Sequence, residues 1–385
     1  MPWKERTVMS VREEFVTQLL QGEKSMSALC REYDISRKTG YKWLTRAKSG
    51  QELADKSRVP NQIANKTSVA TEALILQTRD EHPVWGPRKL ERYLQNKEYV
   101  ELPCKSTIGN ILSRNGRIEP EASESHQPLR RFERPFPNDL WQMDYKGDFG
   151  MLNGDRCYTL TMLDDHSRFS LCLKAQGGTT YRGFKPELVR VFEEYGLPQA
   201  ILCDNGKPWG DSKGGLTMFD VWMMQLDILP IHIRPKHPQT QGKEERFHGT
   251  LKRELLQRRI ITNLNEAQTL FDPWREEYNR ERPHEAIGMD VPAKRYRESK
   301  RKYRELLPEP EYESGSRLRK VNYKGYISIN QHRYYLTEAL IDKYLLLCNE
   351  TEDVVSLHYG MFQVAKIDLN ERCIVSKRIY RNQQL

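Results

Sequence analysis

A change of pattern at Asn138 constrains the fold of this 385-residue chain more than any other feature. Three strand patterns joined by tight polar turns cover residues 140–147, 157–164 and 169–174. A helix, a strand, a second helix and a second strand follow, over residues 180–195, 199–203, 216–226 and 229–233. Three antiparallel strands followed by alternating helices and strands predict a layered α/β domain. We assign residues 138–296 to it.

The helical pattern over residues 241–258 has two different faces. At about 100° per residue, Phe247, Leu251 and Leu255 form one apolar ridge, and Glu244 lies on the side of that ridge. The opposite face carries Gln241, Glu245, His248 and Lys252. Glu245 is therefore the acid that is free to point into a polar site. An ordinary solvated helix face is the alternative.

Two aspartates complete a set of acids with Glu245. Asp144 lies inside the first strand, and Asp204 directly follows the buried fourth strand, where α/β sheets gather ligand sites. Taken singly, each acid is an ordinary surface or turn residue. Brought together, three carboxylates repel one another unless a cation neutralises them. We therefore expect a site for Mg²⁺ (or Mn²⁺), with two ions placed to clamp both sides of a phosphoryl transfer.

The first 50 residues predict three short helices and a DNA-binding function. The helices cover residues 11–20, 27–33 and 37–48, with Ser36 as N-cap of the third. The turn over 33–36 has the length of a helix-turn-helix, which makes the third helix the recognition helix. Its expected DNA contacts are Arg37, Lys38, Lys42, Arg46 and Lys48. A three-helix packing module with a solvated basic face is the alternative.

A second candidate helix-turn-helix occupies residues 67–116. Its helices are expected over residues 67–80, 88–96 and 107–114, with Ser106 capping the last. Trp85 is expected to anchor the core of this module. The possible DNA contacts are Arg88, Lys89, Lys105 and Arg114. Two such modules in tandem suggest a long or bipartite DNA site, and polar linkers over residues 51–66 and 117–137 flank the second module.

The C-terminal part reads as a separate all-β domain. Residues 297–316 form a linker that contains Pro308 and Pro310, following a basic stretch that begins at Lys294, and residues 317–385 come after it. Short alternating runs cover residues 326–329, 334–336, 344–347, 354–359 and 362–367. This pattern predicts a small β-barrel or sandwich, and we choose the barrel.

Composition favours a polyanionic partner and a reducing compartment. The net charge is +9, from 62 Lys and Arg against 53 Asp and Glu, which suits a phosphate backbone. Seven scattered cysteines form no CxxC pair and no zinc-finger spacing, so we expect reduced thiols. No apolar signal core and no run of 18 apolar residues occurs, so we expect a cytoplasmic protein with no membrane partner.

Five motifs together resemble a known family. They are Trp141-Gln-Met-Asp144, Leu163-Asp-Asp-His-Ser-Arg168, Cys203-Asp-Asn-Gly206, the stretch from His237 to Lys252, and Tyr278-Asn-Arg-Glu-Arg-Pro-His284. As a set they resemble the bacterial insertion-sequence transposases with a retroviral-integrase-type core. The resemblance is strong over residues 138–296 and weaker over the two helix-turn-helix candidates.

The resemblance implies a ribonuclease-H-like fold and a DDE triad of metal ligands, which falls on Asp144, Asp204 and Glu245. It implies hydrolysis at a transposon end that exposes a 3′-OH, then joining of that hydroxyl to target DNA. Double-stranded DNA and at least a second copy of the chain are the implied partners, in a bacterial cytoplasm beside the nucleoid. Residues expected near the DNA backbone are Lys243, Arg246, His248 and Lys252.

One departure from the family concerns the interval between Asp204 and Glu245, which is longer here than in much of the family. We place the extra residues in the Gly-rich loop 207–215. If that loop is not an insertion, Asp211 or Asp220 becomes a rival for the second acid, although neither follows a buried strand.

Three other polar residues have expected roles, and two of them, Asp165 and His284, also have an alternative. We expect Asp165 and His166 to support the metal ligands from behind, although Asp165 alternatively only ends its strand. His284 is expected either to pack against the core or to touch DNA.

Two other functions remain open at this point. One is a DNA-binding regulator that no longer cuts, and the retention of all three acids argues against it. The other is a ribonuclease-H-like nuclease without strand transfer, which the tandem DNA-binding modules disfavour.

Overall fold

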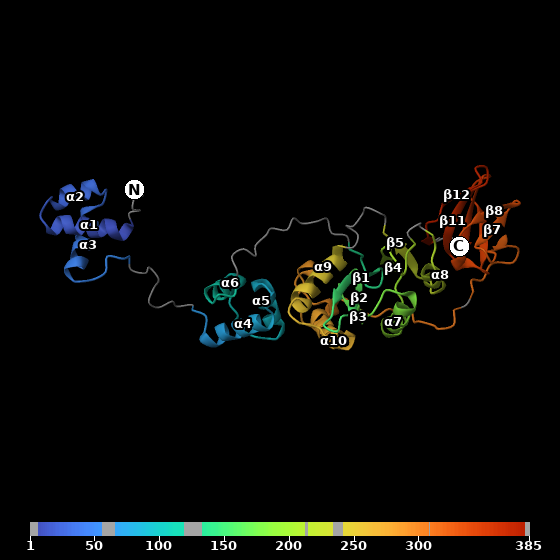
Figure 1. The fold of residues 1–385 in the computed structure, drawn as a ribbon, viewed down its shortest axis with the longest axis horizontal. Coiled ribbons are helices and arrows are strands. Elements are labelled where there is room, and N and C mark those ends of the chain that lie inside the picture. The colour runs from blue at the N-terminus through green and yellow to red at the C-terminus, as the bar shows by residue number, and fades with distance from the viewer. Residues whose placement is uncertain are drawn as a thin grey trace. The chain divides into compact units, whose positions relative to one another are not determined.

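The computed structural model describes residues 7–55, 66–118, 133–211, 215–233, 242–307 and 309–381. The chain divides into two compact units, Met1–Lys66 and Thr67–Leu385. Figure 1 labels their helices and strands.

The first unit is a three-helix module. Its helices are α1 (Val8–Leu20), α2 (Met26–Glu32) and α3 (Arg37–Lys48). The prediction for α3 is confirmed, including its cap, because the Ser36 hydroxyl accepts from the Thr39 backbone N–H at 3.1 Å. Phe15, Leu29 and Trp43 fill the small core. Gly40 permits this packing, because a Cβ there would lie 2.7 Å from Cys30 Sγ and 2.8 Å from Met26 Sδ.

The second helical module opens the second unit. Its helices are α4 (Val69–Glu81), α5 (Pro87–Asn96) and α6 (Lys105–Arg114). They pack around Trp85, Leu90 and Ile108, so the prediction of Trp85 as a core anchor is confirmed. The cap predicted for α6 is wrong. Cys104 stands at the N-cap without a side-chain cap bond, and Ser106 already lies inside the helix.

The α/β domain contains a five-stranded mixed sheet. In chain order its elements are β1 (Trp141–Gly150), β2 (Arg156–Asp164), β3 (Ser170–Gln176), α7 (Tyr181–Tyr195), β4 (Ala200–Cys203), α8 (Met218–Gln225) and β5 (Leu229–His232). The strand order is β3-β2-β1-β4-β5. The first three strands pair antiparallel, whereas β4 pairs parallel with both β1 and β5. The predicted ribonuclease-H-like layered domain is thus confirmed.

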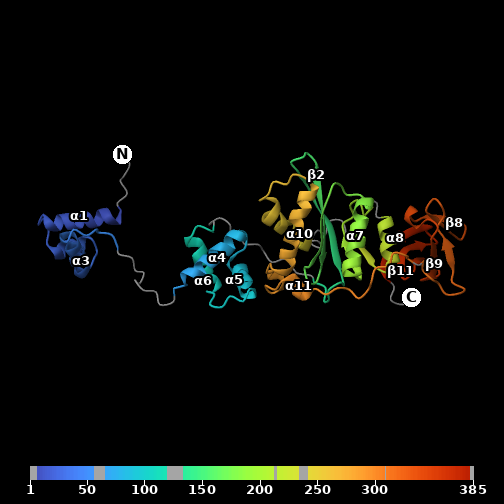
Figure 2. The same cartoon turned by 90° about the horizontal axis from the view of Figure 1, so that it is seen from below.

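Helices cover both faces of this sheet. Figure 2 shows α7 and α8 on one side and α10 (Leu264–Arg280) on the other. α9 (Gly242–Leu251), its π-helical continuation (Lys252–Leu256) and α10 share one core cluster with the strands. Successive strand residues serve opposite faces. Met162 packs in the cluster that contains α7 and α8, while Leu163 packs in the cluster that contains α9 and α10. After α10 come two short helices, Glu285–Ile287 and Pro292–Arg295 (α11).

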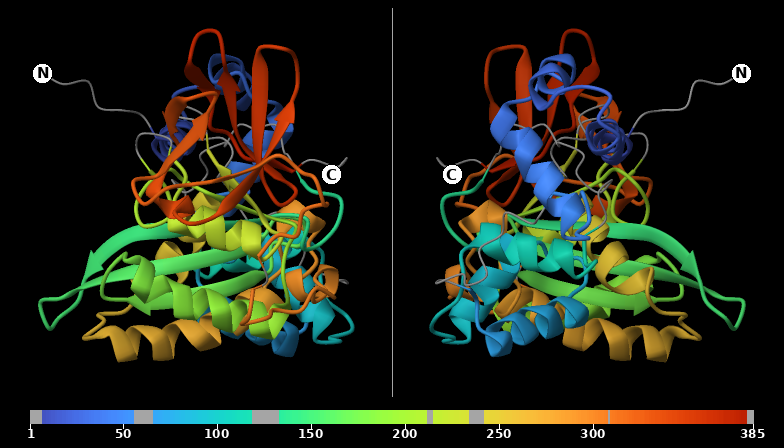
Figure 3. Two further views of the ribbon diagram at one scale, coloured as in Figure 1. Left: turned by 90° about the vertical axis from the view of Figure 1, so that its right-hand side faces the viewer. Right: turned by 90° about the vertical axis from the view of Figure 1, so that its left-hand side faces the viewer.

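The C-terminal part is an antiparallel sheet and a hairpin. Its strands are β6 (Leu318–Lys320), β7 (Tyr326–Ile329), β8 (His332–Tyr335), β9 (Tyr344–Asn349), β10 (Val354–Tyr359), β11 (Phe362–Asp368), β12 (Cys373–Ser376) and β13 (Tyr380–Arg381). Figure 3 shows these strands in orange to red. The sheet runs β12-β11-β10-β9-β6, β13 pairs with β11, and β7 pairs only with β8.

The closed barrel expected for this part is not found in the described residues. The two outer strands, β12 and β6, are four and three residues long, and they do not pair with each other there. Edges this short offer few backbone groups for closure, so the sheet remains open.

No described helix combines the length and the apolar character that crossing a lipid bilayer requires.

Candidate active site

The parallel pairing of β1 with β4 brings Asp144 and Asp204 side by side. Gln142 is opposite Leu202 in this ladder. Asp144 comes two residues after Gln142, and Asp204 comes two residues after Leu202. Since side chains alternate with a period of two, both acids point to the same face of the sheet. Two carboxylates that lie 60 positions apart in sequence therefore meet in the fold.

Asp144 is partly buried and lies near other negatively charged groups. Its side chain is 19% exposed. Burial raises the pKa of Asp144 to about 7, and the charges of Asp204 and Glu245 add to the increase. Repulsion from two other acids means that all three carboxylates share one electrostatic site. Such a site favours a positively charged occupant.

α9 places its two neighbouring glutamates differently. Glu245 is exposed, whereas Glu244 is fully buried beside Phe247. Glu244 Oε2 lies 3.0 Å from Thr161 Oγ1 on β2. Burial, and then the charge of Asp144, raise the pKa of Glu244 well above its ordinary value. The sequence interpretation is confirmed on this point: Glu244 faces the apolar ridge, and Glu245 is the acid that remains accessible.

His248 does not lie on the open face on which the helical pattern puts it. Its side chain is 13% exposed. Nε2 lies 2.8 Å from Thr161 Oγ1, and Nδ1 lies 3.8 Å from Asp144 Oδ2. Burial, followed by the charge of Lys146, lowers the pKa of His248 to about 3. The imidazole is therefore neutral and packs beneath the acids. The pattern missed this because a helix facing a twisted sheet buries more than a single ridge.

Asp165 ties the end of β2 to the first turn of α9. Its buried carboxylate accepts hydrogen bonds from Gln142 Nε2 at 2.7 Å and from the Arg134 backbone N–H at 2.8 Å. Lys243 Nζ forms an ion pair with the same carboxylate and reaches the Asp165 carbonyl at 3.2 Å. Lys243 lies two positions before Glu245. Asp165 thus supports the helix that carries the accessible acid, and the Lys243 ammonium group is already engaged.

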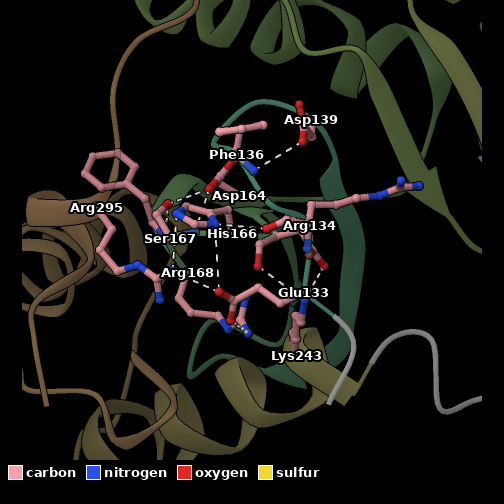
Figure 4. Close-up of polar contacts among 12 residues, drawn as sticks. Glu133, Arg134, Phe136, Asp139, Asp164, His166, Ser167, Arg168, Lys243 and Arg295 are labelled. Atoms are coloured by element: carbon pink, nitrogen blue, oxygen red, sulfur yellow. Dashed lines mark hydrogen bonds and ion pairs between the residues drawn. The ribbon is translucent and has the colours of Figure 1, made fainter. Parts of the chain in front are cut away.

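His166 shares Arg134 with Asp165 but otherwise contacts a different set of residues, drawn in Figure 4. Its Nδ1 lies 2.9 Å from the Arg134 carbonyl, and its Nε2 lies 3.3 Å from Arg295 Nη2. Glu133 joins this group through Arg168 at 3.0 Å and Arg295 at 2.8 Å. The two residues expected to act together are thus linked through Arg134, and beyond it Asp165 contacts α9 while His166 contacts α11.

Hydrogen bonds hold Asp204 on both its backbone and its carboxylate. Oδ1 accepts from Trp209 Nε1 at 2.6 Å and from the Gly206 backbone N–H at 3.0 Å. The Asp204 carbonyl lies 3.1 Å from Nδ1 of His232 on β5. These contacts come from two segments, the loop after β4 and strand β5, and the two from the loop give the carboxylate a defined orientation.

The two rival acids are engaged elsewhere. Asp220 is buried, caps α8 through Thr217, and places Oδ1 2.6 Å from His232 Nε2. Asp211 Oδ2 accepts from the Gly215 backbone N–H at 3.1 Å. Asp204 remains the acid next to Asp144.

The sequence interpretation missed two residues near the acids, Trp209 and Lys146. Trp209 is 1% exposed although it lies in the Gly-rich loop treated as an insertion. A tryptophan in such a polar stretch was the available signal. Lys146 is half-buried, and burial and then the charge of Lys252 lower its pKa. Strand alternation places Lys146 on the same face of β1 as Asp144. The pairing of β1 with β2 is irregular between Tyr145 and Asp148, which makes that alternation a weak signal here.

The donor set suits a hard divalent cation. Across the described parts of the chain, no three His, Cys, Asp or Glu side chains converge as a complete ligand set. Mg²⁺ does not require one, because it is usually held by one or two carboxylates together with water and substrate phosphates. Asp144 and Asp204 supply two adjacent carboxylates, and Glu245 is close enough to influence the first. The residues therefore fit the expected ion.

The basic residues of α3 lie largely on its surface. Arg37, Lys38 and Lys42 are exposed. Lys42 Nζ stands 4.3 Å from the centroid of the Trp43 ring, and Arg46 Nη1 donates to the Ala54 carbonyl at 2.7 Å. The first turn of α3 therefore presents cations to solvent, as a recognition helix requires.

Basic residues of α5, and Lys97 directly after it, instead contact acids that follow α10 in the chain. The ion pairs are Arg88–Glu285 at 3.6 Å, Arg92–Asp290 at 3.2 Å and Lys97–Glu281 at 2.9 Å. Burial, and then the charge of Arg282, lower the pKa of Lys89 to about 8. Lys105, at the start of α6, is exposed. His284 is buried beside Tyr278, which is the first of its two expected placements.

Comparisons with protein families agree with this geometry. Residues 134–238 and 226–292 match the integrase core domain. Residues 39–112 match a homeodomain-like domain, which spans from α3 to α6.

Several curated relatives are proteins of bacterial insertion elements. The chain is 28% identical over 259 residues to the 39.2 kDa protein of insertion element IS476 of Xanthomonas euvesicatoria, covering 63% of this chain and 69% of the relative. It is 27% identical over 157 residues to the 31.7 kDa protein of IS407 of Burkholderia multivorans, covering 41% of this chain and 54% of the relative. It is 31% identical over 118 residues to an IS136 protein of Agrobacterium fabrum, covering 30% of this chain and 58% of the relative. The chain thus spans little more than half the length of the last two.

Two solved structures align at low identity. The catalytic core domain of HTLV-2 integrase in complex with magnesium shares 15% identity at a TM-score of 0.32, covering 42% of this chain and 97% of that one. The simian T-cell lymphotropic virus intasome shares 16% sequence identity at a TM-score of 0.36, covering 81% of this chain and 98% of that one. The family matches and the insertion-element relatives support the predicted resemblance to insertion-sequence DDE transposases with an integrase-type core.

Proposed function

We propose that this protein, whose core and relatives are those of an insertion-sequence transposase or integrase acting on DNA, is a DNA transposase. It binds the ends of its element, hydrolyses the phosphodiester there to expose a 3′-OH, and joins that hydroxyl to target DNA. The observation that carries the proposal is the pairing register that sets Asp144 beside Asp204, with Glu245 close enough to raise the pKa of Asp144.

Asp144, Asp204 and Glu245 are the residues that would hold Mg²⁺ (or Mn²⁺), two ions per site. A bound ion would supply charge neutralisation and activation of an attacking oxygen. The chain's own contribution is to position the three carboxylates. The Trp209 and Gly206 donors orient Asp204, and the Asp165–Lys243 pair fixes the start of the helix that carries Glu245.

DNA recognition is assigned mainly to the first helical module. Arg37, Lys38 and Lys42 on α3 are exposed cations suited to phosphates and base edges. Arg246 and Lys252, exposed on the segment that carries Glu245, are proposed to contact the backbone of the DNA being cut. Two element ends must be brought together before joining, so we propose at least a dimer on DNA, beside the nucleoid of a bacterial cell.

The test is replacement of each acid by its amide. Asp144→Asn, Asp204→Asn and Glu245→Gln should each abolish metal-dependent cleavage and strand transfer on end-containing DNA, while gel-shift binding of the ends persists. Asp211→Asn is the matched control, because Asp211 is an acid that follows Asp204 in the same loop but lies outside the β1–β4 pairing register. It should retain activity.

Full activity in any of the three amide variants would contradict the assignment. Glu244→Gln separates the two neighbouring glutamates. Its amide can still hydrogen-bond to Thr161, so we expect it to retain much more activity than Glu245→Gln. The reverse order would make Glu244 the third acid.

The same assay distinguishes other functions. Joined products identify a transposase, cleavage without joining identifies a nuclease, and end binding with neither identifies a regulator.

A further inference from the structure

We propose that Trp209 is a positioning residue for Asp204: its indole N–H fixes one carboxylate oxygen and leaves the other directed to the metal. This inference rests on the proposed function, because it concerns the same acids. The contact is short, with Trp209 Nε1 2.6 Å from Asp204 Oδ1.

Both hydrogen bonds to the Asp204 carboxylate fall on the same oxygen. The Gly206 backbone N–H donates to Oδ1 at 3.0 Å, beside the indole. Within the described ranges, the bonds found to this carboxylate leave Oδ2 for another partner. A carboxylate with one oxygen held by two donors presents its second oxygen in a single direction, and a preferred direction is what a metal ligand needs.

Trp209 is itself held rigidly between two aromatic rings. Its ring stacks on Tyr145 at 5.0 Å between centroids and 7° between planes, and it meets Phe184 edge-on at 5.5 Å and 76°. Its backbone carbonyl accepts from Thr217 Oγ1 at 2.8 Å. Tyr145 follows Asp144 directly in β1. One aromatic stack therefore links the segments that carry both aspartates.

The loop around Trp209 can close only with glycine at position 210. A Cβ on Gly210 would lie 2.4 Å from the carbonyl carbon and oxygen of Asn205. The Gly210 backbone N–H donates to the Gly206 carbonyl at 2.8 Å. This tight turn brings the side chain of Trp209 back under Asp204, so the described part of the loop that the sequence marks as an insertion works as a support for the site.

Phenylalanine at position 209 isolates the hydrogen bond from the packing. Trp209→Phe keeps an aromatic ring against Tyr145 and Phe184 but removes the donor. The control is Trp222→Phe, because Trp222 is 5% exposed in the same core cluster and packs on Phe192 instead. Both variants shorten a buried tryptophan in the same way.

The readout is the concentration of Mn²⁺ or Mg²⁺ that half-saturates the metal-induced rise in Tm of the full chain, measured without DNA. We expect Trp209→Phe to raise this concentration about tenfold to a hundredfold, the usual effect of losing a group that orients a metal ligand. Trp222→Phe should leave it unchanged. Cleavage by Trp209→Phe should recover at high Mn²⁺.

An unchanged metal midpoint in Trp209→Phe, with only the metal-free Tm lowered, would overturn the inference and leave Trp209 as a packing residue. An equal rise in Trp222→Phe would also overturn it. Asp204→Asn tests the proposed function separately, because it must lose the metal-induced stabilisation. If Asp204→Asn keeps that stabilisation, the ligand assignment itself fails.

Discussion

The two helical modules carry similar numbers of basic residues but use them differently. On α3, Arg37 and Lys38 are exposed at the first turn. On α5, Arg88 and Arg92 lie 3.6 Å and 3.2 Å from carboxylates that come almost 200 positions later in the chain. A basic helix is therefore not by itself a DNA-binding helix. What matters is whether the fold supplies its cations with acidic partners.

The acids opposite α5 are regularly spaced. Glu277, Glu281 and Glu285 follow one another at intervals of four, and Asp290 lies shortly after them. His82 joins the set, with Nδ1 3.1 Å from Glu277 Oε1. These acids pair with this face of the second module, whereas Lys105 at the start of α6 is exposed.

The largest expected difference between the modules is in binding to element ends. Arg37→Ala with Lys38→Ala should weaken end binding about tenfold to a hundredfold, because two exposed phosphate-binding cations are lost. The slope of log affinity against log salt should fall by about 2, at about 0.9 per phosphate contact. Fluorescence anisotropy over a salt series measures both quantities.

The matched variant is Arg88→Ala with Arg92→Ala, which also removes two charges. It should change end affinity less than about threefold, since both cations already have acidic partners. If this variant loses as much affinity as the α3 variant, α5 contacts DNA and the contrast between the modules is wrong.

Much of the fold was predictable because its signals are local. The bounds of α3, β7 and β10 agree with the sequence prediction, since a cap or a clear alternation marks them. Whether the C-terminal strands close into a barrel was not predictable in this way, and the predicted barrel is not found in the described residues. Closure depends on pairing between strands distant in sequence, and the short strands β6 and β12 carry no local signal for that pairing.

For the candidate site, the sequence indicated the acids and the supporting role of Asp165, but not the contacts that hold them. Periodicity alone separated Glu245 from Glu244, because one turn of helix decides which side chain faces the core. The hydrogen bond of Trp209 to Asp204 and the pair between Lys243 and Asp165 depend on how loops fold back. Such contacts leave no period in the sequence, so they appear only in the structure.

A glycine in each module tests how closely its helices pack. Gly40→Ala should destabilise the first unit by about 1–3 kcal/mol, because a Cβ there lies 2.7 Å from Cys30 Sγ and overpacks the core. Gly109→Ala in α6 is the control. Its Cβ meets only Pro87 Cγ, at 3.6 Å, so helix propensity should stabilise that module by about 0.5–1 kcal/mol.

Hydrogen exchange of the full chain reports the two modules separately. Protection should fall over α1 to α3 in Gly40→Ala and rise over α4 to α6 in Gly109→Ala. Equal responses would mean that the first module is packed no more tightly than the second.

The ion pair between Arg92 on α5 and Asp290 is expected to contribute less to stability than the packing around Gly40. Arg92→Asp should lower stability by no more than about 1 kcal/mol, because both side chains are 38% exposed and water screens the pair. Adding Asp290→Arg should restore most of the loss at low salt. A double-mutant cycle by chemical denaturation measures this coupling, and Arg280 with Glu276, an exposed pair within α10, gives the baseline. A cycle with zero coupling would show that the Arg92–Asp290 pair does not hold α5.

A further expected effect is a pH dependence carried by Lys89. Burial, and then the charge of Arg282, lower its pKa to about 8 in the folded chain from 10.5. Between these values the unfolded chain binds more protons than the folded one, so stability contributed by this group rises with pH across that range. Lys89→Met removes the titrating group and keeps an apolar chain of similar length. The variant should therefore be the more stable at pH 7, and its advantage should shrink at pH 9. Calorimetry at both pH values checks this. A constant difference would mean that Lys89 is solvated, as an exposed DNA-binding lysine would be. In that case the cations of α5 would resemble those of α3.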